Sequence, residues 1–339
     1  MNQRKRAGNE TCLVLAGIAL LVLVVTMLGI SLPARAETKK FKPAPGSGTP
    51  TFAVREPVLR VQPGDTVETE TLYGGYYEKA GGKWPGEVGP FYVEGAAPGD
   101  TLVVKIVRLH PNVDHAVSTH TPGGISAVAS DRYTRMLNEP ISQRRYVWKI
   151  EKDGTVGVLD LPNSKKSVEV PLRPMLGRVA VAPDGEEAWG GLWPGNFGGN
   201  MDASDVREGA TVYLPVFHEG AYFYFGDVHA LQGDGEICGS GLETTAEVTF
   251  QFDLIKGKKL AWPRIENSDY LMTVGSVRPL SDALRIAAVE MIEWLVADYG
   301  FEKSDAYQFV SQLAEMRVAN MVDPNYSVVV KIPKRHLPR

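Results

Sequence analysis

Short runs of β-prone residues, separated by turns rich in glycine and proline, recur along most of this chain. The sequences QPGD (62–65) and APGD (97–100) are near copies, and each places a Pro-Gly turn before an apolar run. Many short strands with frequent turns predict a β-rich domain. The expected strands are Ala53–Val61, Val67–Tyr73, Phe91–Val93, Leu102–Val107, Val156–Leu161, Val168–Val170, Val179–Val181, Val212–Phe217, Val248–Leu254 and Tyr326–Ile332.

Strong helical periodicity occurs only near the C-terminus. Apolar residues from Leu284 to Leu295 recur at helical spacing, and Ser281 is expected to cap this helix. A second helix is expected from Ser304 or Asp305 to about Ala314. The predicted fold class is therefore α+β, with a large β part and a C-terminal helical part. No clean boundary divides residues 51–339, which we expect to form one domain.

The first 36 residues resemble a secretory signal peptide. Arg4, Lys5 and Arg6 precede the apolar run Leu13–Leu32, and Ala34-Arg35-Ala36 is a small-x-small cleavage site. The alternative is an uncleaved membrane anchor, because the apolar run is long enough to span a bilayer. Residues 37–50 are polar and rich in Pro, Gly and Ser, which predicts a flexible linker. We expect a periplasmic or secreted protein with no membrane contact after cleavage.

The remaining chain is mildly acidic. Residues 1–36 hold four basic and one acidic residue, so 32 basic and 39 acidic residues follow them. No basic patch stands out, which argues against nucleic acid as a partner. Cys238 is the one cysteine left after cleavage and therefore has no internal disulfide partner.

Metal-binding side chains concentrate in GDVHALQGDGEICGSGLE, residues 226–243. Asp227 and His229 are two residues apart, so they would lie on one face of an extended segment. Upstream, Asn200 and Asp202 form a second pair of oxygen donors. Oxygen and imidazole ligands together suit Zn²⁺ or a similar divalent ion. Glu236 and Glu243 could then act as general base and acid.

A turn is the alternative interpretation of the same stretch, because Asp side chains in glycine-rich runs often bond nearby backbone amides. The chain lacks H-E-x-x-H, paired C-x-x-C and EF-hand motifs. It also lacks G-x-S-x-G, which argues against a serine hydrolase. His110, His115 and His120 lie in HPNVDHAVSTH, which we expect to be a surface loop, with a metal site as the alternative.

Residues 214–250, LPVFHEGAYFYFGDVHALQGDGEICGSGLETTAEVTF, closely resemble the acetamidase/formamidase family. The segments GPFYVEGAAPGDTLVVKI (89–106), PMLGRVAVAP (174–183) and GGNMD (198–202) resemble further family segments in the expected order. The resemblance spans about Pro57 to Pro333. Sixteen positions match in the first segment: Leu214, Pro215, Val216, Gly220, Ala221, Gly226, Asp227, His229, Ala230, Gln232, Gly233, Asp234, Gly235, Glu236, Gly239 and Glu243.

This resemblance implies hydrolysis of small linear amides, formamide or acetamide, to ammonia and the carboxylic acid by a β-rich, metal-associated homo-oligomer. The metal is expected to be Zn²⁺, with Ca²⁺ as the alternative. Carried over by position, the expected metal ligands are Asn200, Asp202, Asp227 and His229. The expected catalytic pocket residues are Gln232, Asp234, Glu236 and Glu243. The alternatives are a non-catalytic binding protein on the same fold and an amidase for a larger amide.

Two segments depart from the family pattern. Many members carry a histidine before the GP-x-YVEGA segment, whereas here Leu72–Val88 holds aromatic residues and no histidine. Trp189, Trp193 and Phe197 precede the GGN-x-D segment, where they either belong to the core or line a pocket for something larger than acetamide. Acetamide itself requires only a small, closed pocket.

Overall fold

The structure is a computed structural model that describes residues 36–120 and 142–338. The expected signal peptide lies outside the described residues except for Ala36, so its cleavage stays a prediction. Within 36–120 and 142–338, no helix has both the length and the apolar character needed to cross a membrane.

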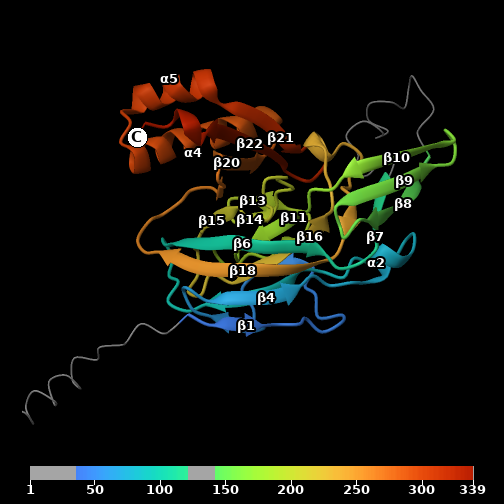
Figure 1. Cartoon of the computed structure of the whole chain (residues 1–339). Helices are drawn as coiled ribbons and strands as arrows, with labels where there is room; N and C mark the ends of the chain where they lie inside the picture. Colours follow the sequence, from blue (N-terminus) through green and yellow to red (C-terminus); the bar gives the residue numbers. More distant parts are fainter. Residues whose placement is uncertain (1–35, 121–141, 339) are drawn as a thin grey trace, which may run out of the picture. The chain divides into compact units, whose positions relative to one another are not determined.

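Two large, mostly antiparallel sheets make up most of the described β structure (Figure 1). The nine-stranded sheet runs β1 (Thr38–Lys40), β4 (Thr66–Glu70), β18 (Ala246–Ile255), β6 (Thr101–Pro111), β15 (Thr211–Pro215), β19 (Arg264–Glu266), β20 (Tyr270–Val277), β22 (Tyr326–Pro333), β21 (Glu315–Asn320). The eleven-stranded sheet runs β10 (Lys166–Pro171), β9 (Val156–Leu161), β8 (Arg144–Glu151), β7 (His115–His120), β17 (Glu243–Thr244), β16 (Phe223–His229), β11 (Met175–Ala180), β14 (Gly198–Asn200), β13 (Pro194–Gly195). In that sheet β5 (Val88–Val93) also pairs with β16, and β3 (Leu59–Val61) pairs with β5. A separate pair joins β2 (Thr51–Phe52) to β12 (Trp189–Gly190).

Aromatic side chains join the two sheets. Phe223 and Phe225 alternate along β16, and Phe250 and Phe252 alternate along β18, so each pair lies on one face of its strand. The ring centroids are 4.8 Å apart for Phe225–Phe250 and 5.3 Å apart for Phe223–Phe252. All four side chains are fully buried. The main core therefore lies between the sheets, and β16 carries functional side chains on a rigid strand.

Two helices near the C-terminus cover β20 and β22 (Figure 1). Helix α4 (Leu280–Tyr299) ends at Gly300 in the left-handed conformation, and α5 (Lys303–Leu313) begins after Glu302, whose carboxylate accepts from the backbone of Ser304. Ser281 lies inside α4, so its expected capping role was wrong; Pro279 occupies the N-cap without a side-chain bond. The short helical turns are α2 (Gly75–Glu78), η1 (Asp234–Glu236) and η2 (Lys334–His336).

The α+β prediction with C-terminal helices is confirmed, and three further local predictions were wrong. Only the last part of the expected strand Ala53–Val61 forms a strand, namely β3 (Leu59–Val61). Residues 53–58, which follow β2, are not in a strand. The expected histidine loop is largely strand, since β6 includes His110 and β7 begins at His115. The expected linker 37–50 includes β1, which pairs in parallel with β4.

In both Pro-Gly-Asp turns the aspartate carboxylate accepts hydrogen bonds from two backbone amides. Asp65 accepts hydrogen bonds from the backbone of Gln62 at 2.8 Å and of Glu37 at 2.9 Å. Asp100 accepts from the backbone of Ala97 at 2.9 Å and of Gly257 at 2.8 Å, and also pairs with Lys256. Burial opposes ionisation of both carboxyls, but these bonds outweigh it and lower the pKa of each.

Asp100→Asn is expected to lower the free energy of unfolding at pH 7 by about 2 kcal/mol, since hydrogen bonds to charged groups are worth roughly 1.5–3 kcal/mol. A lowered folded pKa stabilises the fold above the unfolded value of about 3.9, and this contribution is lost as the pH falls through the folded pKa. The difference between wild type and variant should therefore shrink towards pH 3. Urea unfolding at pH 7 and pH 3 measures both effects. Asp160→Asn, an exposed carboxylate on β9, is the control, and an equal loss in both variants would contradict the assignment.

Candidate active site

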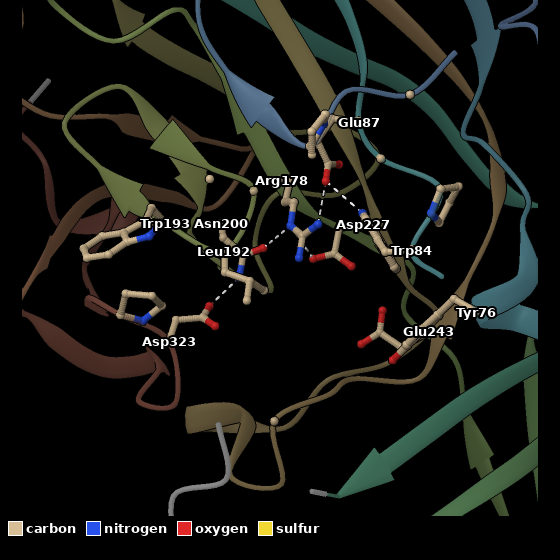
Figure 2. Close-up of a pocket in the computed structure, with 18 of the residues that line it drawn as sticks. Tyr76, Trp84, Glu87, Arg178, Leu192, Trp193, Asn200, Asp227, Glu243 and Asp323 are labelled. Atoms are coloured by element: carbon tan, nitrogen blue, oxygen red, sulfur yellow. Dashed lines mark hydrogen bonds and ion pairs between the residues drawn. The ribbon is translucent and has the colours of Figure 1, made fainter. Parts of the chain in front are cut away.

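A cavity of about 700 Å³ opens between the loop before β13 and the segment around α2 (Figure 2). It is larger than the small, closed pocket that acetamide requires. Side chains from both ends of the sequence meet here. The lining residues are Gly48, Pro50, Tyr76, Trp84, Pro85, Gly86, Glu87, Arg178, Gly190, Gly191, Leu192, Trp193, Asn200, Asp227, Glu236, Gly239, Glu243, Asp323 and Pro324.

His229, which is buried, lies beside the carboxylates of this cavity. Its Nε2 atom is 3.3 Å from Asp227 Oδ1 and 3.2 Å from Glu243 Oε1. The three residues converge because β16 carries Asp227 and His229 and pairs antiparallel with β17, where His229 lies opposite Glu243. The pairing of β16 with β17 therefore brings together metal-binding side chains that all belong to the stretch 226–243.

Gln232 fixes the orientation of the imidazole. Its Nε2 donates to the backbone carbonyls of Asp202 at 2.8 Å and Ala319 at 3.0 Å, so its Oε1 faces His229 Nδ1 at 2.8 Å. Because carbonyl oxygens only accept, Gln232 Oε1 must be the acceptor and His229 Nδ1 must carry the proton. The Nε2 atom of His229 is then left to face the carboxylates, in the arrangement typical of metal-ligating histidines.

A second group of polar residues adjoins the first. Asn200 Nδ2 donates to Asp202 Oδ2 at 2.7 Å and also to Asp323, and Asn320 Nδ2 donates to Asp202 Oδ2 at 2.6 Å. Asp323 and Asn320 reach the site because β21 lies against η1, where Met321 N donates to Gly235 O at 3.1 Å. The C-terminal part of the chain thus completes the cluster.

The buried Arg178 connects the two groups of polar residues. Arg178 Nη1 lies 2.5 Å from Glu87 Oε1, and Arg178 Nε lies 3.1 Å from Asp227 Oδ2 and also donates to Asn200. Its guanidinium lies over the ring of Trp84, 4.7 Å from the centroid. Figure 2 shows these contacts at the centre of the cavity wall. Arg178 therefore holds three polar side chains from separate segments in one arrangement.

The backbone of this cluster is strained at three of its acids. Asp202, Asp227 and Glu236 have φ values of 45°, 57° and 47°, in the left-handed region that non-glycine residues seldom occupy. Such strain concentrates at functional sites, where the surrounding structure holds it.

Two glycines leave room for the clustered side chains. A Cβ at Gly177 would lie 2.5 Å from Asp202 Oδ1 and 2.9 Å from Asp227 Oδ2, so these two oxygens face the same point. A Cβ at Gly241 would lie 2.5 Å from His229 Nδ1. Any larger residue at either position would displace a candidate ligand.

Burial and mutual repulsion shift the pKa values of the cluster. Burial, with repulsion from neighbouring carboxylates, raises the pKa of Asp202 and Glu236 well above their usual ranges and also raises that of Glu243. Burial raises the pKa of Asp323 to about 6. Burial opposes the charged form of His229, but Glu243 and Asp227 outweigh it and raise its pKa. Burial likewise opposes ionisation of Asp227, but Arg178 and His229 outweigh it and lower its pKa.

The donor set fits a divalent cation. Three overlapping groups each place three ligand atoms within 4.8 Å of one another: Asp202–Asp227–His229, His229–Glu236–Glu243 and Asp202–Glu236–Asp323. Asp202 Oδ1 and Glu243 Oε2 are buried and have no hydrogen-bond partner among the described residues. Unpaired buried acceptors are costly, and a bound cation would satisfy them. These acidic groups could therefore bind a metal.

The structure brings together seven of the eight residues that the sequence singled out. Asn200, Asp202, Asp227, His229, Gln232, Glu236 and Glu243 are all buried within this cluster. Asp234 is different, because its side chain is 51% exposed and pairs with Arg317, with Nε 3.1 Å from Oδ2. The expected place of Asp234 in the pocket was therefore wrong; the left-handed turn at Gly235 directs neighbouring side chains apart.

Five polar or aromatic residues of the cavity were not expected from the sequence: Glu87, Arg178, Asp323, Tyr76 and Trp84. Arg178 did carry a signal, since it is a charged residue in the apolar strand β11, where all other residues are buried. A buried charge requires a partner. Asp323 and Glu87 showed no comparable local pattern. The histidines at 110 and 115 belong to none of the three donor groups found among the described residues.

Comparison with known proteins agrees with this geometry. A model of the acetamidase/formamidase family matches residues 119–337. The chain belongs to the acetamidase/formamidase family. The match covers the histidine, Gln232 and every clustered acid except Glu87, so the resemblance inferred from residues 214–250 is confirmed.

Solved structures of the acetamidase/formamidase family share the fold over nearly the whole chain. An acetamidase from Yersinia enterocolitica is 34% identical with a TM-score of 0.80, over 92% of this chain and 96% of that one. A predicted acetamidase/formamidase from Thermoanaerobacter tengcongensis is 28% identical with a TM-score of 0.75, over 88% and 97%. The β-rich acetamidase/formamidase-like fold is therefore confirmed.

Curated relatives match over a shorter stretch. An acetamidase from Mycolicibacterium smegmatis is 26% identical over 240 residues, which is 57% of this chain and 58% of that protein. A formamidase from Methylophilus methylotrophus is 25% identical over 209 residues, or 50% and 51%. The chain thus spans little more than half the length of the curated relatives that it matches.

Proposed function

We propose that this protein hydrolyses the C–N bond of a linear amide to ammonia and a carboxylic acid. The observation that carries the proposal is the buried His229, Asp227 and Glu243 constellation beside a cavity that opens to solvent. Family membership supports the same activity, since relatives are named acetamidase and formamidase.

The proposal includes a divalent metal, and the donor chemistry favours Zn²⁺, with Ca²⁺ as the alternative. Asp227 and His229 would hold it, with Asp202 as the next ligand and Asn200 orienting Asp202. When bound, such an ion polarises a carbonyl and makes a neighbouring water more acidic. Gln232 would hold the imidazole with Nε2 available, as its hydrogen bonds indicate.

Two glutamates would move the protons. Both Glu236 and Glu243 line the cavity, and both side chains are buried. One glutamate takes a proton from the attacking water as the C–O bond forms, and a proton is then delivered to the amide nitrogen as the C–N bond breaks. The products are ammonia and the carboxylic acid, so atoms and charge balance.

The setting of the enzyme is part of the proposal. The basic residues Arg4, Lys5 and Arg6, the apolar run that follows and the small-x-small site favour export to the periplasm or beyond. Likeness to the family favours a homo-oligomer.

Ammonia release by the purified chain, residues 37–339, tests the activity. Formamide and acetamide are expected to yield ammonia. A chelator is expected to lower the rate of ammonia release by at least about tenfold. Adding Zn²⁺ should restore the activity. Adding Ca²⁺ should restore it only if the oxygen ligands of the site are enough to bind the ion without the imidazole. Metal content measured by mass spectrometry on the same sample shows whether an ion was present. Metal-loaded, folded protein that releases no ammonia from any amide would contradict the proposal and favour a binding role.

A further inference from the structure

We infer that the amide accepted by this cavity is a neutral primary amide whose acyl group ends in an aromatic ring. The inference rests on the proposed amide hydrolysis, because it assigns the part of the cavity that a small amide would leave empty. A separate apolar subsite would hold the ring, and Leu192 and Trp193 form it, while Tyr76 and Trp84 line the opposite side of the same cavity.

The size of the cavity exceeds the need of acetamide. Pockets of about 300–1,000 Å³ enclose molecules of drug size. The volume of about 700 Å³ lies inside that range. Acetamide has four non-hydrogen atoms and would fill only a small part of it. A substrate that excludes water from the whole cavity must therefore carry a substantial substituent.

The chemistry of one wall suits an apolar, flat group. Leu192 is 42% exposed and Trp193 is 37% exposed, although both are large apolar residues. The Trp193 ring is held edge-on by Trp189, with centroids 5.1 Å apart and planes at 77°. Backbone at Gly190 and Gly191 adds no side chain to this wall. Covering these exposed surfaces with a ligand would release ordered water and favour binding.

The facing wall is aromatic and rigid. Tyr76 and Trp84 pack edge to face, with centroids 5.2 Å apart and planes at 76°. Arg178 lies over Trp84 at 4.7 Å, which fixes the indole further. This wall is therefore held rigid beside Glu243, on the side of the cavity where the amide group would lie.

The carboxylates lie where the amide end of such a substrate must be. Figure 2 shows Trp193 and Leu192 on the opposite side of the cavity from Tyr76 and Glu243, with Arg178 and Asp227 between them. A molecule that spans the cavity thus reaches the apolar wall and Glu243 at the same time. Five acidic side chains and one basic side chain line the cavity, which disfavours an acyl group that carries a carboxylate.

Phenylacetamide and acetamide, both primary amides that release ammonia, form the test. Phenylacetamide is expected to have the higher kcat/KM by about 10- to 100-fold, the gain expected for burying an aromatic side group. In the Leu192→Ala and Trp193→Ala variants, kcat/KM should fall about tenfold more for phenylacetamide than for acetamide. The non-hydrolysable ketones 1-phenylpropan-2-one and acetone report binding alone, by calorimetry.

Matched controls keep the test specific. Val289→Ala, a 57% exposed residue on α4, and Trp262→Ala, in a separate hollow, should leave the ratio between the two amides unchanged. An equal or higher kcat/KM for acetamide, with no tighter binding of the phenyl ketone, would overturn the inference. If no amide is cleaved but the phenyl ketone binds more tightly and loses that advantage in Leu192→Ala, the proposed hydrolysis fails and the aromatic subsite stands.

Discussion

Glu243→Gln is expected to lower kcat for amide hydrolysis by about 10²- to 10⁴-fold, the usual contribution of a positioned acid or base. Glu243 lines the cavity and accepts a 2.9 Å hydrogen bond from Gly241 N, and its other oxygen is buried with no hydrogen-bond partner in the part of the chain that the structure describes. Glutamine has nearly the same shape but cannot take up a proton. The measurement is steady-state ammonia release with the metal content of each sample determined in parallel.

Two further substitutions make this result specific. Glu236→Gln is expected to reduce kcat by a similar factor, because Glu236 also lines the cavity. Asp234→Asn is the matched control, since Asp234 lies two residues away but is exposed and paired with Arg317. It should retain activity within about threefold, as surface substitutions usually have small effects. Full activity in both glutamate variants would show that the proton-transfer assignment is wrong.

Arg178→Met is expected to lower the free energy of unfolding by about 3–5 kcal/mol, the usual cost of removing one partner of a buried ion pair. The substitution leaves Glu87 and Asp227 buried without their cation, although the packing volume is largely kept. Activity should fall as well, because Asp227 and Asn200 lose the group that positions them. Urea unfolding and ammonia release on the same protein measure the two effects.

Arg264→Met separates stability from function. Arg264 is also buried, lies 2.7 Å from Glu290 and covers Trp294 with its guanidinium 5.0 Å from the ring centroid, outside the cavity. It should destabilise the fold by a comparable amount while kcat of the folded enzyme stays unchanged. If Arg178→Met matched it in both respects, Arg178 would have no positioning role.

Several features of this protein follow from its sequence alone. Pro-Gly turns and β-prone runs predicted the β-rich fold, because these patterns act over a few residues and need no distant partner. The stretch 226–243 predicted Asp227, His229 and Glu243 for the same reason, since β16 and β17 are neighbours in the chain and pair directly. The C-terminal helices followed from apolar spacing, whereas their caps did not, because Pro279 and Glu302 begin them instead of serine.

Tertiary structure alone decided the rest of the site. Glu87 is 91 residues from Arg178, and Asn200 is 123 residues from Asp323, so no local spacing relates these partners. Their convergence depends on how β5, β11 and β14 share one sheet and on β21 lying against η1. The same long-range packing separates exposed Asp234 from buried Glu236 and leaves Trp193 at the cavity while Phe197 enters the core. Local patterns determine which residues are available, and chain-distant packing determines which of them meet.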